Sequence, residues 1–115
     1  MSSALTFTHS YPVDGVIAPS WLDVPPDTSG NPFTIKDKFG LAASVQVVGD
    51  FEGSTVMLQV SNDGVHWLPL RDLAGDPIEL TEGALAEFSS SALYIRPMRT
   101  GGISASVSVV MVLRG

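Results

Sequence analysis

Residues 55–70 read TVMLQVSNDGVHWLPL, and the fold class follows from this stretch. Every second side chain of its first half is aliphatic: Val56, Leu58 and Val60. A period of two predicts a strand that buries one face. The turn at residues 62–64 then predicts a hairpin, because glycine tolerates the positive φ of a tight turn and the Asn62 or Asp63 side chain can cap it. Residues 65–70, which carry Trp67, are the expected returning strand.

The same period of two recurs in most of the remaining chain. It predicts strands over residues 4–10, 41–48, 78–81, 93–98 and 104–114, a short strand or turn within 33–39, and a strand or one helical turn over 84–88. Turn signals separate these segments, and no stretch has a helical period. Pro97 lacks a backbone donor, so it marks the end of its strand, a sheet edge or a bulge. The pattern predicts an all-β protein, an antiparallel β-sandwich that is jelly-roll-like.

Residues 11–32 interrupt this pattern with prolines at positions 12, 19, 25, 26 and 32. Proline fixes φ, removes a donor and keeps the preceding residue extended, so we expect an extended Pro-rich N-terminal arm. The chain would then be a single domain with two parts: a first strand and arm over 1–32, and a β-sandwich over 33–115. Three arrangements of the arm stay open: it covers a sheet of its own subunit, it reaches a neighbour, or it is disordered. The side chains that would contact a neighbour are apolar: Tyr11, Trp21, Leu22 and Val24.

Composition narrows the classes of partner. The chain has 115 residues and a formal charge of −6, which disfavours binding to nucleic acid. The N-terminus lacks the basic and apolar regions of a secretory signal, and the apolar run at 109–113 is far too short to cross a bilayer. We therefore expect a soluble protein made in a cytoplasm, with no membrane partner.

Catalytic and metal-binding patterns are missing from the sequence. His9 and His66 are the only histidines, there is no cysteine, and neither a Gly-x-Ser-x-Gly turn nor a phosphate-binding loop occurs. We expect no enzymatic activity, no catalytic residues, no metal and no cofactor. Binding remains. Trp67 fits a core position or a stacking face for a sugar or a protein. Arg96 and Arg99 fit side chains that are solvated or paired with nearby acids, or an ion pair between subunits.

The order of the motifs resembles the capsid decoration, or cement, proteins of tailed bacteriophages, which have a jelly-roll-like fold. The motifs are GSTV at 53–56, LQVSNDGVHW at 58–67, LRD at 70–72, YIRP at 94–97, TGG at 100–102 and the valine-rich strand that ends at Arg114. The similarity covers residues 41–114. It implies a non-enzymatic virion protein that is made in the host cytoplasm, lies on the outer capsid surface and clamps neighbouring major capsid subunits. The expected partners are therefore the major capsid protein and other copies of this chain.

Two other functions stay open. The segment SNDGVHW at 61–67 also looks like a hairpin of discoidin-type carbohydrate-binding sandwiches, which would make the protein a glycan-binding module for host adhesion. The second of these alternatives is a tail or head–tail connector subunit. For the virion functions, the candidate partner-binding residues are Tyr11, Trp21, Leu22, Val24, Arg96 and Arg99.

Overall fold

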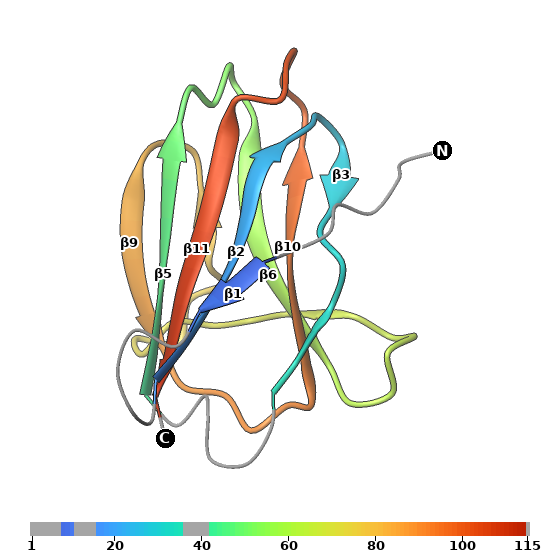
Figure 1. Ribbon diagram of the computed structural model, residues 1–115, viewed down its shortest axis with the longest axis vertical. Helices are drawn as coiled ribbons and strands as arrows, with labels where there is room; N and C mark the ends of the chain where they lie inside the picture. Colours follow the sequence, from blue (N-terminus) through green and yellow to red (C-terminus); the bar gives the residue numbers. More distant parts are fainter. Residues whose placement is uncertain (1–7, 11–15, 36–41, 115) are drawn as a thin grey trace.

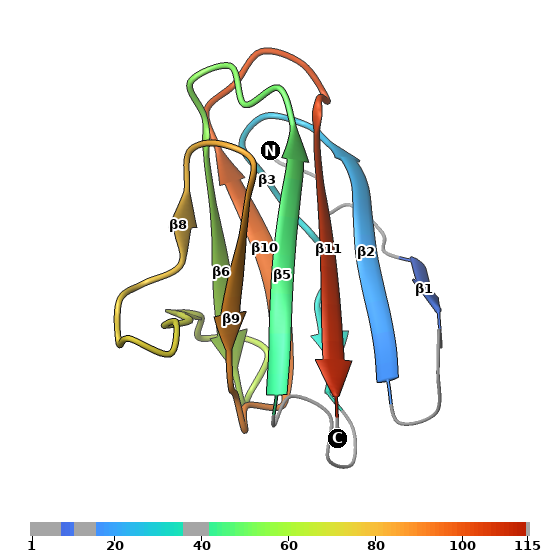
Figure 2. The ribbon, with the colours of Figure 1, turned by 90° about the vertical axis from the view of Figure 1, so that its left-hand side faces the viewer.

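A computed structural model describes residues 8–10, 16–35 and 42–114. All regular structure in these ranges is β-strand, which leaves no helix there that could cross a membrane. The strands form two antiparallel sheets that pack face to face (Figures 1 and 2). The predicted all-β sandwich is confirmed.

The first sheet, called here the β11 sheet, has the order β1-β2-β11-β5-β9. Its strands are β1 (Thr8–Ser10), β2 (Val16–Val24), β11 (Val107–Arg114), β5 (Ala42–Gly49) and β9 (Ala84–Phe88). β5 and β11 confirm the strands predicted at 41–48 and 104–114, except that β11 begins at Val107 and residues 104–106 belong to the preceding loop. β9 is the strand alternative for 84–88. The inward side chains of β11 are fully buried: Val107, Val109, Met111 and Leu113.

The second sheet, called here the β10 sheet, is built on β6 (Thr55–Ser61) paired with β10 (Tyr94–Thr100). Beyond β10 lie β3 (Thr28–Ser29) and β4 (Phe33–Thr34), and beyond β6 lie β7 (Leu68–Pro69) and β8 (Glu79–Leu80). Val56 and Leu58 point into the core, as the period of two predicts.

The Pro-rich segment is not an arm, which corrects the expectation for residues 16–32. β2 lies between β1 and β11, inside the β11 sheet (Figure 2). In the ladder between β2 and β11, Ile17 and Ser20 are paired with β11, but Ala18 and Pro19 between them are not. The pairing is interrupted there because proline has no N–H to donate. The later prolines lie at the turn after β2 and before β4. A division at residue 32 would therefore remove strands from both sheets.

Pro97 occupies the middle of β10, so it does not mark the end of a strand. Its carbonyl accepts a hydrogen bond from the Gly30 N–H at 2.9 Å, which places this side of Pro97 against the gap between β3 and β4. The N and C=O of one strand residue point to the same side. The missing donor of Pro97 therefore also faces Gly30, just beyond the last β3 pair of Met98 with Ser29, so the proline forgoes one bond where the pairing with β3 ends.

The turn after β6 is wider than the predicted tight hairpin. Residues 62–67 form a loop, and the returning strand β7 is only two residues long. Gly64 has φ of 75°, as the turn signal predicted. This loop carries Trp67 out of the predicted strand and onto the outer surface of the β10 sheet, where it is half-buried.

Candidate partner-binding surface

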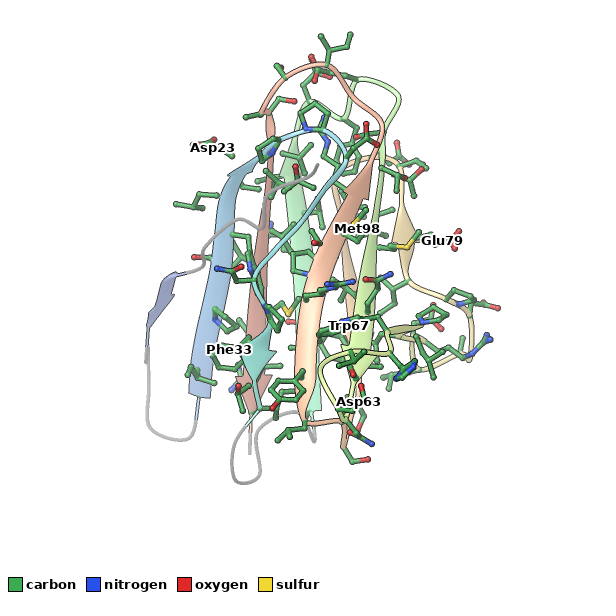
Figure 3. The ribbon with its side chains drawn as sticks, turned by 90° about the vertical axis from the view of Figure 1, so that its right-hand side faces the viewer. Asp23, Phe33, Asp63, Trp67, Glu79 and Met98 are labelled. Carbon is green, nitrogen blue, oxygen red and sulfur yellow. The ribbon has the colours of Figure 1, made fainter. Side chains whose placement is uncertain are left out.

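Aromatic, methionine and arginine side chains gather on the outer face of the β10 sheet. Figure 3 looks onto this face and labels Trp67 and Met98. The inward neighbours on β6 and β10 are buried, so the alternating positions point outward and are half-buried. We call this set the platform: Met57, Gln59, Trp67, Tyr94, Arg96 and Met98. Tyrosine, tryptophan, methionine and arginine are enriched in protein–protein interfaces.

Arg96 connects three members of the platform. Its guanidinium carbon lies 4.1 Å from the centroid of the Trp67 ring, which is a cation–π contact. Its Nε donates a hydrogen bond to Gln59 Oε1 at 2.9 Å, across the β6–β10 pairing. Partial burial lowers the pKa of Arg96, which stays charged at neutral pH. The Trp67, Arg96 and Gln59 side chains are thus oriented before any partner arrives.

The loop that carries Trp67 is organised by Asp63. Its Oδ1 accepts hydrogen bonds from the backbone N–H groups of Val65 and His66, both at 2.8 Å, and from Ser61 Oγ at 2.9 Å. Its Oδ2 lies 2.8 Å from His66 Nδ1. The His66 backbone bond is the main reason that the pKa of Asp63 falls well below its usual range. The predicted capping role of Asp63 is confirmed, and the cap holds Trp67 in place.

The structure separates the apolar candidates of residues 11–24. Trp21 is 0 % exposed and Val24 is 1 % exposed, so neither can reach a partner in this fold. Leu22 is exposed, but it belongs to β2 and lies away from the platform. Tyr11 lies outside the described residues. Trp67, in contrast, is not in the core cluster, so the alternative of core packing is wrong.

Arg99 is completely buried, although it is only three positions after Arg96 on the same strand. Its Nη2 lies 3.3 Å from Glu52 Oε1, which confirms pairing with a nearby acid and leaves no free side chain for an ion pair between subunits. The other hydrogen bonds of the guanidinium reach three segments at one end of the sandwich, through Val24 O, Phe51 O, Ser54 Oγ, Ser104 O and Ser106 Oγ.

Gly102 makes room for this arrangement. Its φ is 97°, and a Cβ at this position would collide with the Arg99 guanidinium. The Gly101-Gly102 turn was predicted as a turn, but its role in covering a buried arginine depends on contacts that the sequence does not encode locally. Arg99 is therefore a structural residue that joins loops 50–54 and 101–106 to the end of β2.

Glu52 should make stability depend on pH. Its pKa falls from 4.5 to about 2, chiefly because the carboxylate accepts a hydrogen bond from the Ser104 backbone N–H. Loss of hydration raises the pKa, whereas hydrogen bonds from the Ile103 N–H and the Ser106 hydroxyl lower it further. A carboxyl with a lower pKa in the folded state stabilises the fold above its unfolded pKa, and this contribution disappears as pH falls through the folded pKa. Asp63 titrates similarly, so a comparison with a Glu52 variant is needed.

We expect the stability difference between the wild type and Glu52→Gln to be constant above about pH 5 and to shrink between pH 4.5 and about 2. Urea unfolding at a series of pH values measures this difference. Asp63→Asn is the matched control, because it keeps the Glu52 contribution. A difference that does not change over this range would contradict the role of Glu52.

Within the described ranges, no three histidine, aspartate or glutamate side chains come together as metal ligands. Sequence reasoning identified Trp67 and Arg96 but missed the other platform residues. The signal was present: Met57, Tyr94 and Met98 alternate with buried positions and are residue types found at interfaces. What the sequence lacked was the pairing of β6 with β10, which places them side by side.

No protein-family model matches the chain, and no curated protein matches it. Among solved structures, the SPBc2 prophage-derived protein YomS is similar with a TM-score of 0.63 at 10% identity, over 92% of this chain and 100% of that chain. A protein of Bacillus endospore appendages, which are disulfide-linked pili, has a TM-score of 0.49 at 15% identity, over 99% of this chain and 91% of that chain. At 10% identity the similarity to YomS shows a shared fold and nothing further.

Proposed function

We propose that this chain is a non-enzymatic virion protein that binds the outer surface of a phage capsid and holds neighbouring major capsid subunits together. The observation that carries the proposal is the platform. It combines interface-enriched side chains with an orientation set in advance by the Arg96 contacts and the Asp63 cap. Pre-organised side chains lose little conformational entropy on binding, which favours a partner.

Two further observations support a phage capsid as the partner. The motif order of residues 41–114 resembles capsid decoration proteins. YomS, which shares the fold over its whole length, is prophage-derived. A small sandwich repeated many times on a capsid lattice needs only a modest interface per copy, because several contacts act together.

A sugar is a weaker fit for the platform. A glycan stacks on an open aromatic face, whereas Arg96 already lies over one face of the Trp67 ring. A glycan array on the purified protein tests this alternative directly. Glycan binding that depends on Trp67, with no capsid binding, would replace the proposed function by a carbohydrate-binding one.

The direct test is binding to capsids assembled from the major capsid protein of the same phage genome. We expect the wild type to co-sediment with these capsids in a fixed ratio. Trp67→Ala with Arg96→Ala should weaken binding about thirty-fold or more, since loss of a central aromatic or arginine anchor costs about 2 kcal/mol or more. Arg71→Ala is the matched control, because Arg71 is exposed, is not a member of the platform and donates to the Gly75 carbonyl of its own loop.

Retained binding by the double variant would remove the platform from the proposal. Absence of co-sedimentation by the wild type would contradict the capsid function itself. Thermal unfolding of each variant establishes that any loss of binding is not a loss of fold.

A further inference from the structure

Ile103 is displayed at the tip of the loop between β10 and β11. It is 82 % exposed, more than any other exposed large hydrophobic side chain in the described ranges. This loop is the uppermost point of the molecule in Figure 1, where it is drawn in red. Single exposed apolar residues are common on protein surfaces, so Ile103 becomes informative only through the way its loop is held and through the surface at the other end of the sandwich.

The loop around Ile103 is rigidly anchored. The backbone N–H groups of Ile103 and Ser104 donate to Glu52 Oε1 at 3.2 and 2.8 Å. The Gly101 N–H donates to Asp27 Oδ1 at 2.8 Å. Glu52 is itself paired with the buried Arg99. The backbone that carries Ile103 is therefore restrained by hydrogen bonds, which lowers the entropic cost of inserting this side chain into a pocket.

This end of the sandwich is acidic. Asp27 and Glu52 bond the Ile103 loop directly, and Asp50 lies beside it, since the Asp50 carbonyl accepts from Ser106 Oγ. Asp23 follows at the end of β2, where its backbone N–H donates to Ser108 Oγ. The one cation among the described residues that contact this loop, Arg99, is buried and paired. A surface that receives Ile103 should therefore be apolar and carry positive charge.

Such a surface exists on the same molecule, toward the opposite end of the β11 sheet. An open groove of about 450 Å³ runs over the ends of β5, β9 and β11. Most of its lining is apolar or small: Ala42, Ala43, Leu73, Leu85, Phe88 and Val112. Leu73 and Leu85 are exposed. Arg114 also lines the groove, and no ion pair within the described residues neutralises it.

One acid, Glu87, lines the groove as well. It lies on β9, opposite Ser44, whereas Arg114 lies on β11, opposite Ala42. β5 lies between these two strands, and Glu87 and Arg114 form no ion pair with each other. Arg114 is therefore available to a carboxylate of another copy.

We propose that the protein assembles head to tail, with the Ile103 loop of one copy inserted into the groove of the next copy and its acidic flank facing Arg114. The two surfaces lie on different parts of the chain, so the contact is heterologous and each copy can bind two others. Such contacts build rings when the rotation closes and filaments when it does not. This self-assembly does not depend on the platform or on the identity of the capsid.

Sedimentation velocity over a concentration series tests the proposal on the full-length protein. The wild type should form species larger than a dimer. Ile103→Asp and Leu85→Asp should each reduce self-association at least about ten-fold, because a charge enters the apolar contact. Both positions are exposed, and thermal unfolding checks that both variants fold.

Mixing the two variants is the sharpest measurement. Ile103→Asp keeps an intact groove, and Leu85→Asp keeps an intact Ile103 loop. A mixture should therefore form dimers that cannot grow further. A wild type that stays monomeric at all concentrations, an Ile103→Asp variant that assembles like the wild type, or a mixture that stays monomeric would each overturn the proposal.

Charge reversal tests the orientation of the contact. Arg114→Glu should weaken assembly about ten-fold, while Arg71→Glu, an exposed arginine outside the groove, should not. Equal assembly by these two variants would overturn the docking of the acidic end onto Arg114.

Discussion

Replacing Trp21 by alanine should lower the free energy of unfolding by about 3–5 kcal/mol, the range for truncating a buried aromatic side chain. Trp21 is 0 % exposed in the core between the sheets. Its indole Nε1 donates to the Asn31 carbonyl at 3.1 Å. The neighbouring backbone at Gly30 passes so close to the indole that a Cβ there would collide with it. Truncation would therefore leave both a cavity and an unpaired carbonyl.

Trp67→Ala is the matched control, since it removes the same side chain from the outer face. We expect it to cost about 1 kcal/mol or less, mainly the lost contact with Arg96. Urea unfolding followed by far-UV circular dichroism measures both variants without relying on tryptophan fluorescence. Similar losses for Trp21→Ala and Trp67→Ala would mean that β2 is not part of the core.

Arg99→Met should be about as damaging, at about 3–5 kcal/mol, because it breaks a buried ion pair by removing one partner. Methionine fills much of the space of the arginine stem but cannot donate to Glu52, Ser54 or the carbonyl oxygens of the surrounding loops. The acceptors that Arg99 now satisfies would lose their donor in a buried site, which costs more than the hydrogen bonds themselves contribute.

The same substitution three positions earlier is the control. Arg96→Met loses one cation–π contact and one hydrogen bond at a half-buried position, for which we expect about 1 kcal/mol. A larger effect of Arg96→Met than of Arg99→Met would contradict the assignment of Arg99 as the structural arginine and Arg96 as a surface one.

Alternation of side chains was sufficient to predict β5, β6 and β11. In β5 and β11 every buried position is apolar, such as Val45 and Val47 on β5, and in β6 only the last buried position, Ser61, is polar. Local turn chemistry also held: Gly64 has a positive φ, and Asp63 caps its loop. These features depend on neighbours within a few residues, so they can be derived without the rest of the chain.

Proline content misled the interpretation of β2. Ile17, Pro19 and Trp21 share the buried face of a strand, whereas the proline at the middle position, considered by its sequence alone, favours an extended arm. A proline is tolerated inside a sheet where the pairing with the adjacent strand is interrupted, as it is between β2 and β11 at Pro19. Whether the pairing is interrupted depends on the partner strand. The burial of Trp21, which removes it from the candidates for partner binding, could not be derived without this pairing.

The contrast between Arg96 and Arg99 marks the limit of what the sequence predicts. Three positions apart on a strand, they point to opposite faces, which the period of two requires. Which face is outward depends on how the β10 sheet packs against the β11 sheet, and the fate of the inward arginine depends on the loops that close over it. Strand identity and turn geometry follow from short-range sterics and the hydrophobic pattern. The platform, the buried Arg99 network and the relation of the Ile103 loop to its groove arise only when residues distant in sequence meet.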